Sequence, residues 1–261
     1  MDLGLSGRRV VITGASKGIG LACARAFAAE GARVVGLARS AAGLAQAREA
    51  LAAAGHAMAV HPVDLRDAAA TRETFDRIAA EHGPVDVLVN SAGAARRRPP
   101  DELDAAALHE AMDAKYFTYM HAIDAVIRGM AARGRGAIVN VIGQGGRQAN
   151  ALHIGGGAAN AALMLATVGY AKAYAAQGVR VNAINPGITR TDRMEEGLAA
   201  AMCAAGLDRA AALAQQMAGV PMGRPAEPEE VADVAIYLAS ARAGYVTGAI
   251  VPMDGGKASV I

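Results

Sequence analysis

Short runs of mostly apolar residues recur along the chain. Most of them are rich in β-branched residues, as Val10, Val11 and Ile12 are in the first run. A strand that is buried on both faces of a sheet has this pattern, because neither face needs polar side chains. The pattern predicts strands at residues 9–12, 33–37, 57–60, 85–90, 137–141, 179–184 and 249–252.

Segments rich in alanine and leucine separate these strands and have the lengths of helices. They lie at residues 19–30, 41–54, 67–82, 103–132, 157–177 and 227–240. Repeated strand–helix alternation predicts a Rossmann-type α/β fold, a doubly wound parallel sheet of about seven strands with helices on both faces. Since no linker rich in Pro, Gly or Ser interrupts the pattern, we expect one domain over residues 1–261.

The segment 189–224 breaks the alternation, because it contains helical stretches without a strand between them. It follows the end of a predicted strand, and doubly wound sheets bind their ligands at that edge. One interpretation is a lid over the substrate, in which Met194, Met202, Met217 and Met222 provide adaptable apolar surface. The other is a pair of ordinary packing helices. The position in the chain favours the lid.

Composition narrows the class of protein. Hydrophobic residues make up 53% of the chain and charged residues 19%, which argues against disorder. A net charge of +2 gives no basic field for nucleic acid or an anionic membrane. Cys23 and Cys203 form no CxxC pair, so neither a disulfide framework nor a zinc site is implied, and no metal site is predicted. The first residues lack the charged and apolar regions of a signal peptide, so we expect a cytoplasmic protein.

Three glycines between the first predicted strand and the first predicted helix carry the clearest binding signal. Gly14 permits a tight turn, Gly18 lets the backbone approach a pyrophosphate, and Gly20 lets the helix pack closely on the sheet. The start of the helix adds N–H donors and the positive end of its dipole. This strand–turn–helix context predicts a dinucleotide site.

The residues after the second predicted strand indicate which dinucleotide is bound. Sites that prefer NAD place an acid there to accept the ribose hydroxyl, whereas this chain has Arg39 and no acid. Arg39 and Lys17 can hold the additional phosphate of NADP. The alternative is that both are solvated surface cations. Their positions favour NADP (NADPH) as the cofactor.

Several motifs resemble those of the short-chain dehydrogenase/reductase family. The glycine turn at 14–20 has that family's spacing, 90–93 resembles its Asn-Asn-Ala-Gly turn, and 181–187 resembles its sixth strand with a Pro-Gly turn beside the nicotinamide. Segments 223–225, 229–232 and 246–256 are similar to its C-terminal signature. With the turn and charge arguments, the resemblance implies cofactor contacts from Gly14, Ser16, Lys17, Gly18, Ile19, Gly20, Arg39, Asp64, Leu65, Asn90, Ala92, Gly93, Asn160, Pro186, Gly187, Ile188 and Thr191.

The resemblance also implies a tyrosine, a lysine four residues later, a serine, and an asparagine on the preceding long helix. Aligned without a gap, this chain has Gly156, Asn160, Gly143 and Lys115 at those positions, and none of its tyrosines is followed by lysine four residues on. Ordinary carbonyl reduction should then be slow, because general acid catalysis contributes roughly 10²–10⁴-fold. The glycines at 155–157 are expected to open space beside the nicotinamide.

Two other residues are candidates for the missing proton chemistry. Lys115 is the cation expected to point inward, and a lysine in an apolar pocket can act as acid or base. His153 precedes the glycines and titrates near neutrality. The alternatives are structural: Lys115 forms an ion pair with Asp113 or another acid, or donates to a backbone carbonyl, and His153 caps a loop.

Three functions therefore stay open. The first is an NADP-dependent oxidoreductase with an atypical active site, which transfers hydride to or from a small organic substrate. The second is a catalytically inactive NADP-binding scaffold, and the third is a non-redox enzyme on the same fold. The resemblance implies a homo-oligomer, a tetramer or a dimer, and no nucleic acid or membrane partner is expected.

Overall fold

The computed structural model describes residues 2–93 and 95–258, so both ends of the predicted domain lie just outside the described residues. Its strands form one parallel sheet in the order β3-β2-β1-β4-β5-β6-β7. The chain order reverses direction between β1 and β4, which is where a doubly wound sheet binds its ligand. The strands are β1 (Arg9–Thr13), β2 (Arg33–Ala38), β3 (Met58–Pro62), β4 (Val87–Asn90), β5 (Gly136–Val141), β6 (Val179–Pro186) and β7 (Ile250–Met253).

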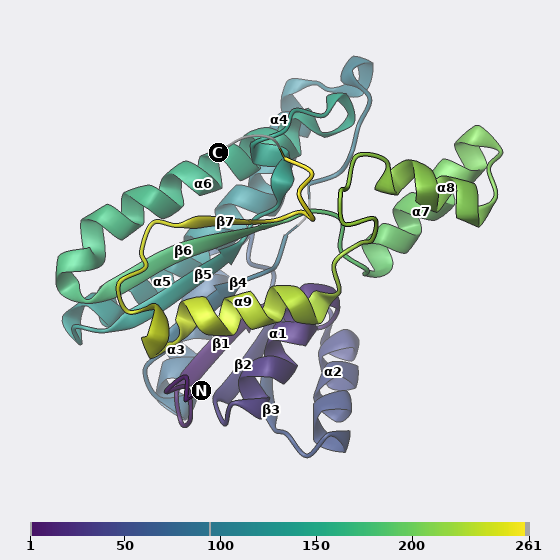
Figure 1. Ribbon diagram of the computed structural model, residues 1–261. Coiled ribbons are helices and arrows are strands. Elements are labelled where there is room, and N and C mark those ends of the chain that lie inside the picture. Colours follow the sequence, from purple (N-terminus) through teal and green to yellow (C-terminus); the bar gives the residue numbers. More distant parts are fainter. Residues whose placement is uncertain (1, 94, 259–261) are drawn as a thin grey trace.

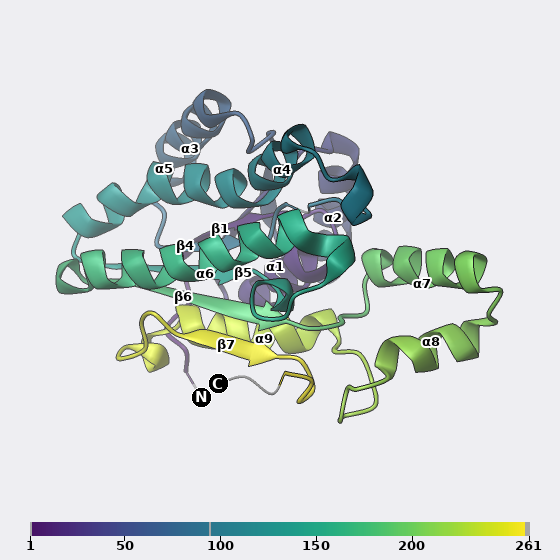
Figure 2. The ribbon, with the colours of Figure 1, turned by 90° about the horizontal axis from the view of Figure 1, so that it is seen from above.

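Helices cover both faces of this sheet, which confirms the predicted fold class (Figures 1 and 2). One face carries α1 (Gly18–Ala29), α2 (Ala41–Ala53) and α9 (Pro228–Ala239); the other carries α3 (Ala68–His82), α5 (Thr118–Ala132) and α6 (Ile154–Tyr174). Each face has its own apolar core, since both sides of every central strand are buried.

The predicted helix at 103–132 consists of two helices joined by one turn of π-helix. That turn, Asp113–Phe117, lies between α4 (Ala105–Met112) and α5. Gly93, with φ +98°, packs against it so closely that a Cβ there would overlap the carbonyl oxygen of Ala114. The wide turn places Lys115 inside the protein, and such turns recur at functional sites.

The glycines at 155–157 do not open space, which corrects the expectation from sequence. Helix α6 begins at Ile154 and includes all three of them. A Cβ at Gly155 would lie 2.9 Å from the Ala111 Cβ, and one at Gly157 would lie 2.8 Å from the Gly145 carbonyl oxygen. The absent side chains let α6 approach α4 and the loop after β5, so neighbouring groups fill the volume.

Helices α7 (Asp192–Ala205) and α8 (Arg209–Met217) form a hairpin that projects from the body of the molecule (Figures 1 and 2). The guanidinium of Arg209 binds both carboxylate oxygens of Glu195, at 2.7 and 3.0 Å, and so links the two helices. The hairpin begins directly after the carboxyl end of β6. Its role as a lid stays a prediction.

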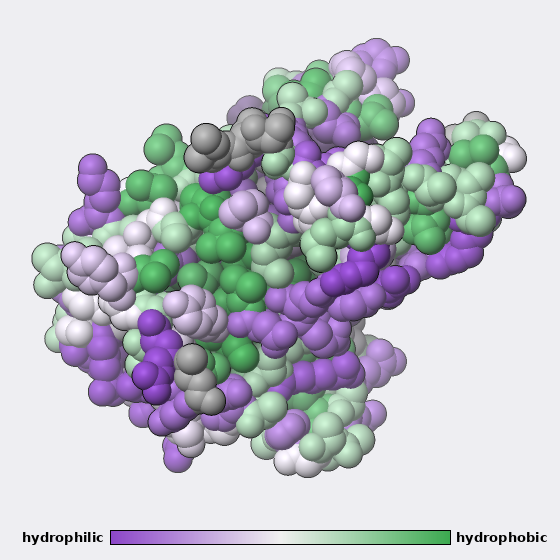
Figure 3. Space-filling view, viewed as in Figure 1, coloured by the Kyte–Doolittle hydropathy of each residue, from purple (hydrophilic) through white to green (hydrophobic). Residues whose placement is uncertain are grey.

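Apolar side chains lie on the surface over β7 and its surroundings (Figure 3). The residues of β7 are only partly buried, and Leu165 of α6 is 76% exposed. With its flanking turns, α6 is long and apolar enough to cross a membrane by composition. This is weak evidence for a membrane span, because Ala159, Leu163 and Ala171 of the same helix are buried in the protein.

Candidate functional site

The glycine turn between β1 and α1 has the geometry that a pyrophosphate site requires. Gly14 and Gly18 have φ of +73° and +55°, which side chains of L-residues rarely allow. A Cβ at Gly14 would lie 2.9 Å from the Ser91 carbonyl oxygen, and one at Gly20 would overlap the Gly14 carbonyl. The turn therefore packs without space for side chains, and its backbone N–H groups remain close to the start of α1.

A buried polar network fixes this turn against the one after β4. The Thr13 hydroxyl accepts hydrogen bonds from the backbone N–H groups of Ser91 and Ala92, at 3.0 and 3.1 Å. The Asn90 amide donates to Asn140 Oδ1 at 3.0 Å, and Asn140 donates to the Thr167 hydroxyl at 3.0 Å. The fully buried Asn90 thus holds strands β4 and β5 together, so it positions the site through the backbone that follows it.

The segment after β6 closes the same site from the other side. Gly187 accepts no side chain, because its Cβ would lie 2.9 Å from the Asp254 Cα. Thr191 precedes α7, and its methyl carbon lies 3.3 Å from the position of a Cβ on Gly18. The structure therefore brings Thr191 beside Gly18 of the glycine turn, whereas Gly187 packs against the segment after β7. The cofactor contacts of Pro186, Gly187, Ile188 and Thr191 stay predictions.

The residues predicted near the adenosine lie at the ends of β1, β2 and β3. Arg39 is exposed directly after β2. Lys17 forms an exposed ion pair with Asp192, at 3.2 Å, and exposed pairs of this kind are weak enough to exchange for a phosphate.

The Asp64 carboxylate binds Arg66, whose Nε lies 3.0 Å from Oδ2, and this contact lowers the pKa of Asp64. Leu65 is buried, whereas Ser16 and Ile19 are partly exposed.

The most informative feature of the candidate reaction site is the position of the His153 ring. A Cβ built on Gly156 would overlap three atoms of the His153 imidazole. The ring therefore occupies the space that a side chain at position 156 would enter. His153 ends a 3-10 turn, Ala151–His153, and directly precedes α6, so its side chain folds over the first turn of that helix.

Asn160 lies next to this imidazole. A Cβ on Gly145 would be 3.1 Å from His153 Cδ2 and 3.3 Å from Asn160 Nδ2, so the two side chains flank the same point. Among the described residues, neither His153 Nδ1 nor Asn160 Oδ1 has a hydrogen-bond partner, although both atoms are buried. Buried polar atoms are costly when unpaired. A sugar or substrate hydroxyl can satisfy them, so the residues present fit a bound nucleotide.

Lys115 points into the protein but is already hydrogen-bonded. Its ammonium donates to the Tyr119 hydroxyl at 2.8 Å and to the Val141 carbonyl at 3.3 Å, and the Tyr119 hydroxyl donates to the same carbonyl. Burial, together with the charge of Arg193, lowers the pKa of Lys115 to about 7. Within residues 2–93 and 95–258 no carboxylate forms an ion pair with it. These contacts agree with the alternative in which Lys115 donates a hydrogen bond to a backbone carbonyl. The ion pair with Asp113 is not found among the described residues.

Tyr119 and Arg193 are two residues that sequence reasoning missed. Tyr119 is fully buried, and desolvation raises the pKa of its hydroxyl. Its spacing of four residues from Lys115 was visible in the sequence, but lysine precedes tyrosine, the reverse of the pattern sought. Arg193 is in the first turn of α7, and its approach to Lys115 depends on the path of the chain between β6 and α7, which no local pattern reveals.

Positive charges surround this site. Burial lowers the pKa of His153, and the charges of Arg97, Arg193 and Lys115 lower it further. Arg98, in the same loop as Arg97, donates to Glu110 at 2.7 Å, and its backbone N–H donates to the Leu152 carbonyl at 3.1 Å. The second contact holds the arginine loop against the turn that carries His153. The arrangement keeps the imidazole neutral at pH 7 and attracts an anion.

A family model described as "Enoyl-(Acyl carrier protein) reductase" matches residues 14–258 of the chain. Galactitol 2-dehydrogenase (L-tagatose-forming) of Cereibacter sphaeroides is 39% identical over 257 residues, covering 97% of this chain and 95% of that protein. Cis-4-hydroxycyclohexanecarboxylate dehydrogenase of Sinomonas cyclohexanicum is 39% identical over 254 residues, covering 97% of each chain.

The fold is also similar to solved structures over its whole length. L-sorbose reductase from Gluconobacter frateurii, complexed with NADPH and L-sorbose, superposes with a TM-score of 0.94. It is 30% identical, and the match covers 100% of both chains. The similarity thus includes the glycine turn, the segment after β6 and the α7–α8 hairpin.

Proposed function

Because this chain belongs to the short-chain dehydrogenase/reductase family, we propose that it is an NADP(H)-dependent oxidoreductase in which His153 carries out the proton transfer. The observation that carries the proposal is the overlap of the His153 imidazole with the space of a side chain at position 156. In the alignment of motifs that position corresponds to the family's tyrosine. An acid or base from a neighbouring residue thus stands where the side chain at 156 is missing.

The neighbours of His153 support this role. Nδ1 is buried without a partner in the described part of the chain, and Asn160 Oδ1 beside it is in the same state. We propose that Asn160 accepts a hydrogen bond from a ribose hydroxyl and that the imidazole exchanges its proton with the substrate oxygen. NADP supplies and accepts the hydride when it is bound.

Lys115 takes a supporting role in this proposal. Its Nζ already contacts Tyr119 and Val141, so it is not free to move to a substrate oxygen without losing both contacts. Its charge lowers the pKa of His153. Lys115 therefore adds to the larger effects of burial, Arg97 and Arg193 on the imidazole, and its ammonium supports the end of β5.

We propose NADP rather than NAD as the cofactor because Arg39 is exposed directly after β2 and Lys17 is only weakly paired. The similar L-sorbose reductase structure contains NADPH. Arg39 can bind the additional phosphate in a bidentate manner, and Lys17 can release Asp192 to contact it.

The charges around the site favour a substrate with an anionic group. Arg97 and Arg193 both act on His153, and they come from different segments, the loop after β4 and the first turn of α7. A carboxylate bound between them would place the carbonyl of a short molecule near the imidazole. The similar enzyme from Sinomonas acts on a hydroxycyclohexanecarboxylate, which has such a group.

The alternatives from the sequence were a catalytically inactive scaffold and a non-redox enzyme. A scaffold needs no ionisable group at the reaction site, whereas here the pKa of His153 is lowered and Lys115, whose pKa is also lowered, is close enough for its charge to act on His153. Such shifts are typical of functional sites, and they favour an enzyme. The intact glycine turn favours redox chemistry.

The proposal is tested by titrating the protein with NADPH and then adding substrates. The panel contains 4-oxocyclohexanecarboxylate and its methyl ester, L-sorbose, L-tagatose, simple ketones, enones and imines. We expect NADPH oxidation, and we expect it to be fastest with the free carboxylate. Arg193→Ala should raise the KM for that substrate roughly tenfold or more. Arg48→Ala, on the exposed side of α2, is the control and should leave that KM unchanged. Tight NADPH binding with no turnover of any compound would support the scaffold instead.

A further inference from the structure

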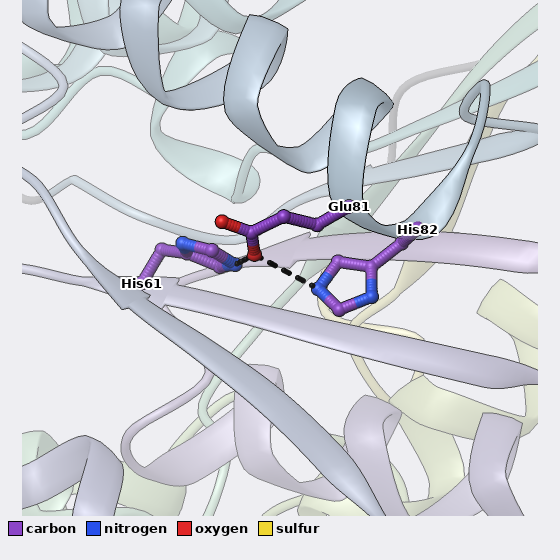
Figure 4. A group of neighbouring side chains, drawn as sticks. All are labelled: His61, Glu81 and His82. Atoms are coloured by element: carbon purple, nitrogen blue, oxygen red, sulfur yellow. Dashed lines mark ion pairs between the residues drawn. The ribbon is translucent and has the colours of Figure 1, made fainter.

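Three side chains that take no part in the candidate reaction site lie together at the edge of the sheet (Figure 4). His61 belongs to the edge strand β3, and Glu81 and His82 end helix α3. The two histidines are far apart in sequence, so no ligand spacing reveals the cluster. In the figure both imidazole rings turn a nitrogen towards the carboxylate of Glu81.

The distances between these groups are those of separated ligands rather than of bonded pairs. Glu81 Oε2 lies 3.7 Å from His61 Nε2 and 3.6 Å from His82 Nε2. Both exceed the range of an N–H···O hydrogen bond, about 2.7–3.2 Å. One ligand atom from each of the three residues lies within 4.8 Å of the other two. Tetrahedral Zn²⁺ with bonds of about 2.0–2.1 Å holds its ligands roughly 3.3–3.4 Å apart, so small side-chain rotations complete the site.

The protein itself leaves one of these ligand atoms, on His82, without a hydrogen-bond partner among the described residues. His82 Nε2 is buried, and no group among the described residues forms a hydrogen bond with it. The side chain of His61 is 12% exposed.

The charges around the cluster leave room for a cation. Besides the three residues, Arg77 is the charged group that acts on His61, and its guanidinium is already held by Glu73 at 3.2 Å. Glu81 is 49% exposed, so the cluster opens towards solvent on that side. A metal ion can enter there, and water can fill a fourth position.

We propose that His61, Glu81 and His82 form a binding site for a divalent transition metal such as Zn²⁺, with water as the fourth ligand. Two imidazole nitrogens and one carboxylate oxygen are a ligand set that suits zinc and disfavours Mg²⁺ and Ca²⁺, which require oxygen ligands. The bound ion would join the edge strand β3 to the end of α3 and stabilise that edge of the sheet.

Calorimetric titration of the full chain with Zn²⁺ tests the proposal, with Mg²⁺ as a comparison. We expect one Zn²⁺ per chain and a rise in Tm of about 5 °C at saturation. His82→Gln and Glu81→Gln should weaken Zn²⁺ binding roughly a hundredfold and remove the rise in Tm. His109→Gln on α4 and Cys203→Ser, which change exposed residues, serve as matched controls and should leave both values unchanged.

His61→Gln adds a third ligand variant, and because His61 lies within the sheet, NADPH binding is measured in parallel to check its folding. Glu81 and His82 are at the end of a helix, so their variants test the site even if His61→Gln misfolds. Zn²⁺ affinity that is unchanged in His82→Gln and Glu81→Gln, or no saturable Zn²⁺ binding by the wild-type chain, would overturn the proposal. If the chain bound Zn²⁺ as expected but did not turn over NADPH, the proposed function would be contradicted and the metal site would still be supported.

Discussion

At the residue scale, the protonation state of His153 decides the direction in which the site works best. Burial and the nearby charge of Arg97 lower its pKa, so the imidazole is neutral at pH 7 and is ready to accept a proton. Reduction of a carbonyl needs the protonated ring, whose population rises only when the pH falls to the lowered pKa of His153. We therefore expect oxidation of an alcohol to be faster at neutral and alkaline pH, and reduction of a carbonyl to be faster at acidic pH.

His153→Ala tests this assignment directly. We expect kcat/KM for reduction to fall by roughly 10²–10⁴-fold in the variant, because the general acid is lost. The wild-type profile should decline as the pH rises through the pKa of His153, and the variant should lose this dependence. Initial rates measured from acidic to alkaline pH provide the comparison. A variant that keeps the wild-type profile would assign the titration to another group.

Lys115 should make folding stability depend on pH. Its pKa falls from 10.5 in an unfolded chain to about 7 in the folded protein. Between these two pH values the unfolded state binds more protons than the folded state, so the free energy of unfolding rises with pH. The stabilisation that comes from deprotonating Lys115 is complete above pH 10.5 and is lost as the pH falls to 7. Relative to Lys115→Met, the wild type should gain up to about 5 kcal/mol over this range.

Denaturant unfolding of wild type and Lys115→Met at about pH 7 and pH 9 measures roughly half of this gain, about 2 kcal/mol. Lys172→Met, at an exposed position of α6, is the control and should follow the wild type at both pH values. Equal stability differences between wild type and Lys115→Met at the two pH values would contradict the lowered pKa.

At the element scale, the start of α6 controls the position of His153. Gly156→Ala should displace the imidazole, since the new Cβ would overlap the ring. Turnover should fall about as far as in His153→Ala, while NADPH affinity changes less than about threefold. Gly169→Ala in the same helix meets nothing within 4 Å and should keep full activity, with a gain of about 0.5–1 kcal/mol in stability. Steady-state rates and thermal melts of both variants separate loss of catalysis from loss of helix stability.

Elements with a strong apolar pattern could be predicted from the sequence, and those set by close packing could not. The sequence predicts a strand at 179–184, within two residues of the bounds of β6, because Val179, Val181 and Ile184 make this short segment mostly apolar and β-branched. The start of α6 was placed three residues late, since three consecutive glycines indicate a loop by propensity. Contacts with Ala111 and Gly145 outweigh that propensity, and such contacts exist only in the folded chain.

The same limit applies to the candidate site. The glycine turn could be read locally because each glycine has a separate mechanical reason. The place of the His153 ring depends on a 3-10 turn that folds back over α6, and the contacts of Lys115 depend on a π-helical turn. Neither turn has a sequence signal of its own, so Lys115 and His153 could be nominated but their roles could not be separated.

At the scale of the whole molecule, the predicted membership of the short-chain dehydrogenase/reductase family and the predicted sheet are confirmed. The correspondence of Gly143, Gly156 and Asn160 to catalytic positions of the family stays a prediction, and so does the lid over the substrate. So does assembly into a dimer or tetramer, for which the partly exposed edge strand β7 offers an apolar surface (Figure 3). Preference for the cofactor also belongs to this scale, because it depends on residues from β1, β2 and α7 together.

Arg39→Asp should reverse that preference. The variant loses a charge-assisted contact with the additional phosphate of NADPH and gains an acid that can accept a ribose hydroxyl. We expect the Kd for NADPH to rise by about tenfold to a hundredfold and the Kd for NADH to fall. Arg48→Asp, which changes an exposed arginine of α2, is the matched control in fluorescence titrations. Unchanged NADPH affinity in Arg39→Asp would remove Arg39 from the cofactor site.

The central claim is that NADPH binds across the carboxyl edge of this sheet and that His153 then completes the reaction. Single-turnover oxidation of bound NADPH by a reactive carbonyl substrate, compared between wild type and His153→Ala, tests it most directly. We expect equal NADPH binding by both proteins and a rate at least about a hundredfold lower in the variant. A wild-type chain that does not bind NADPH, or a variant that turns over as fast as wild type, would contradict it.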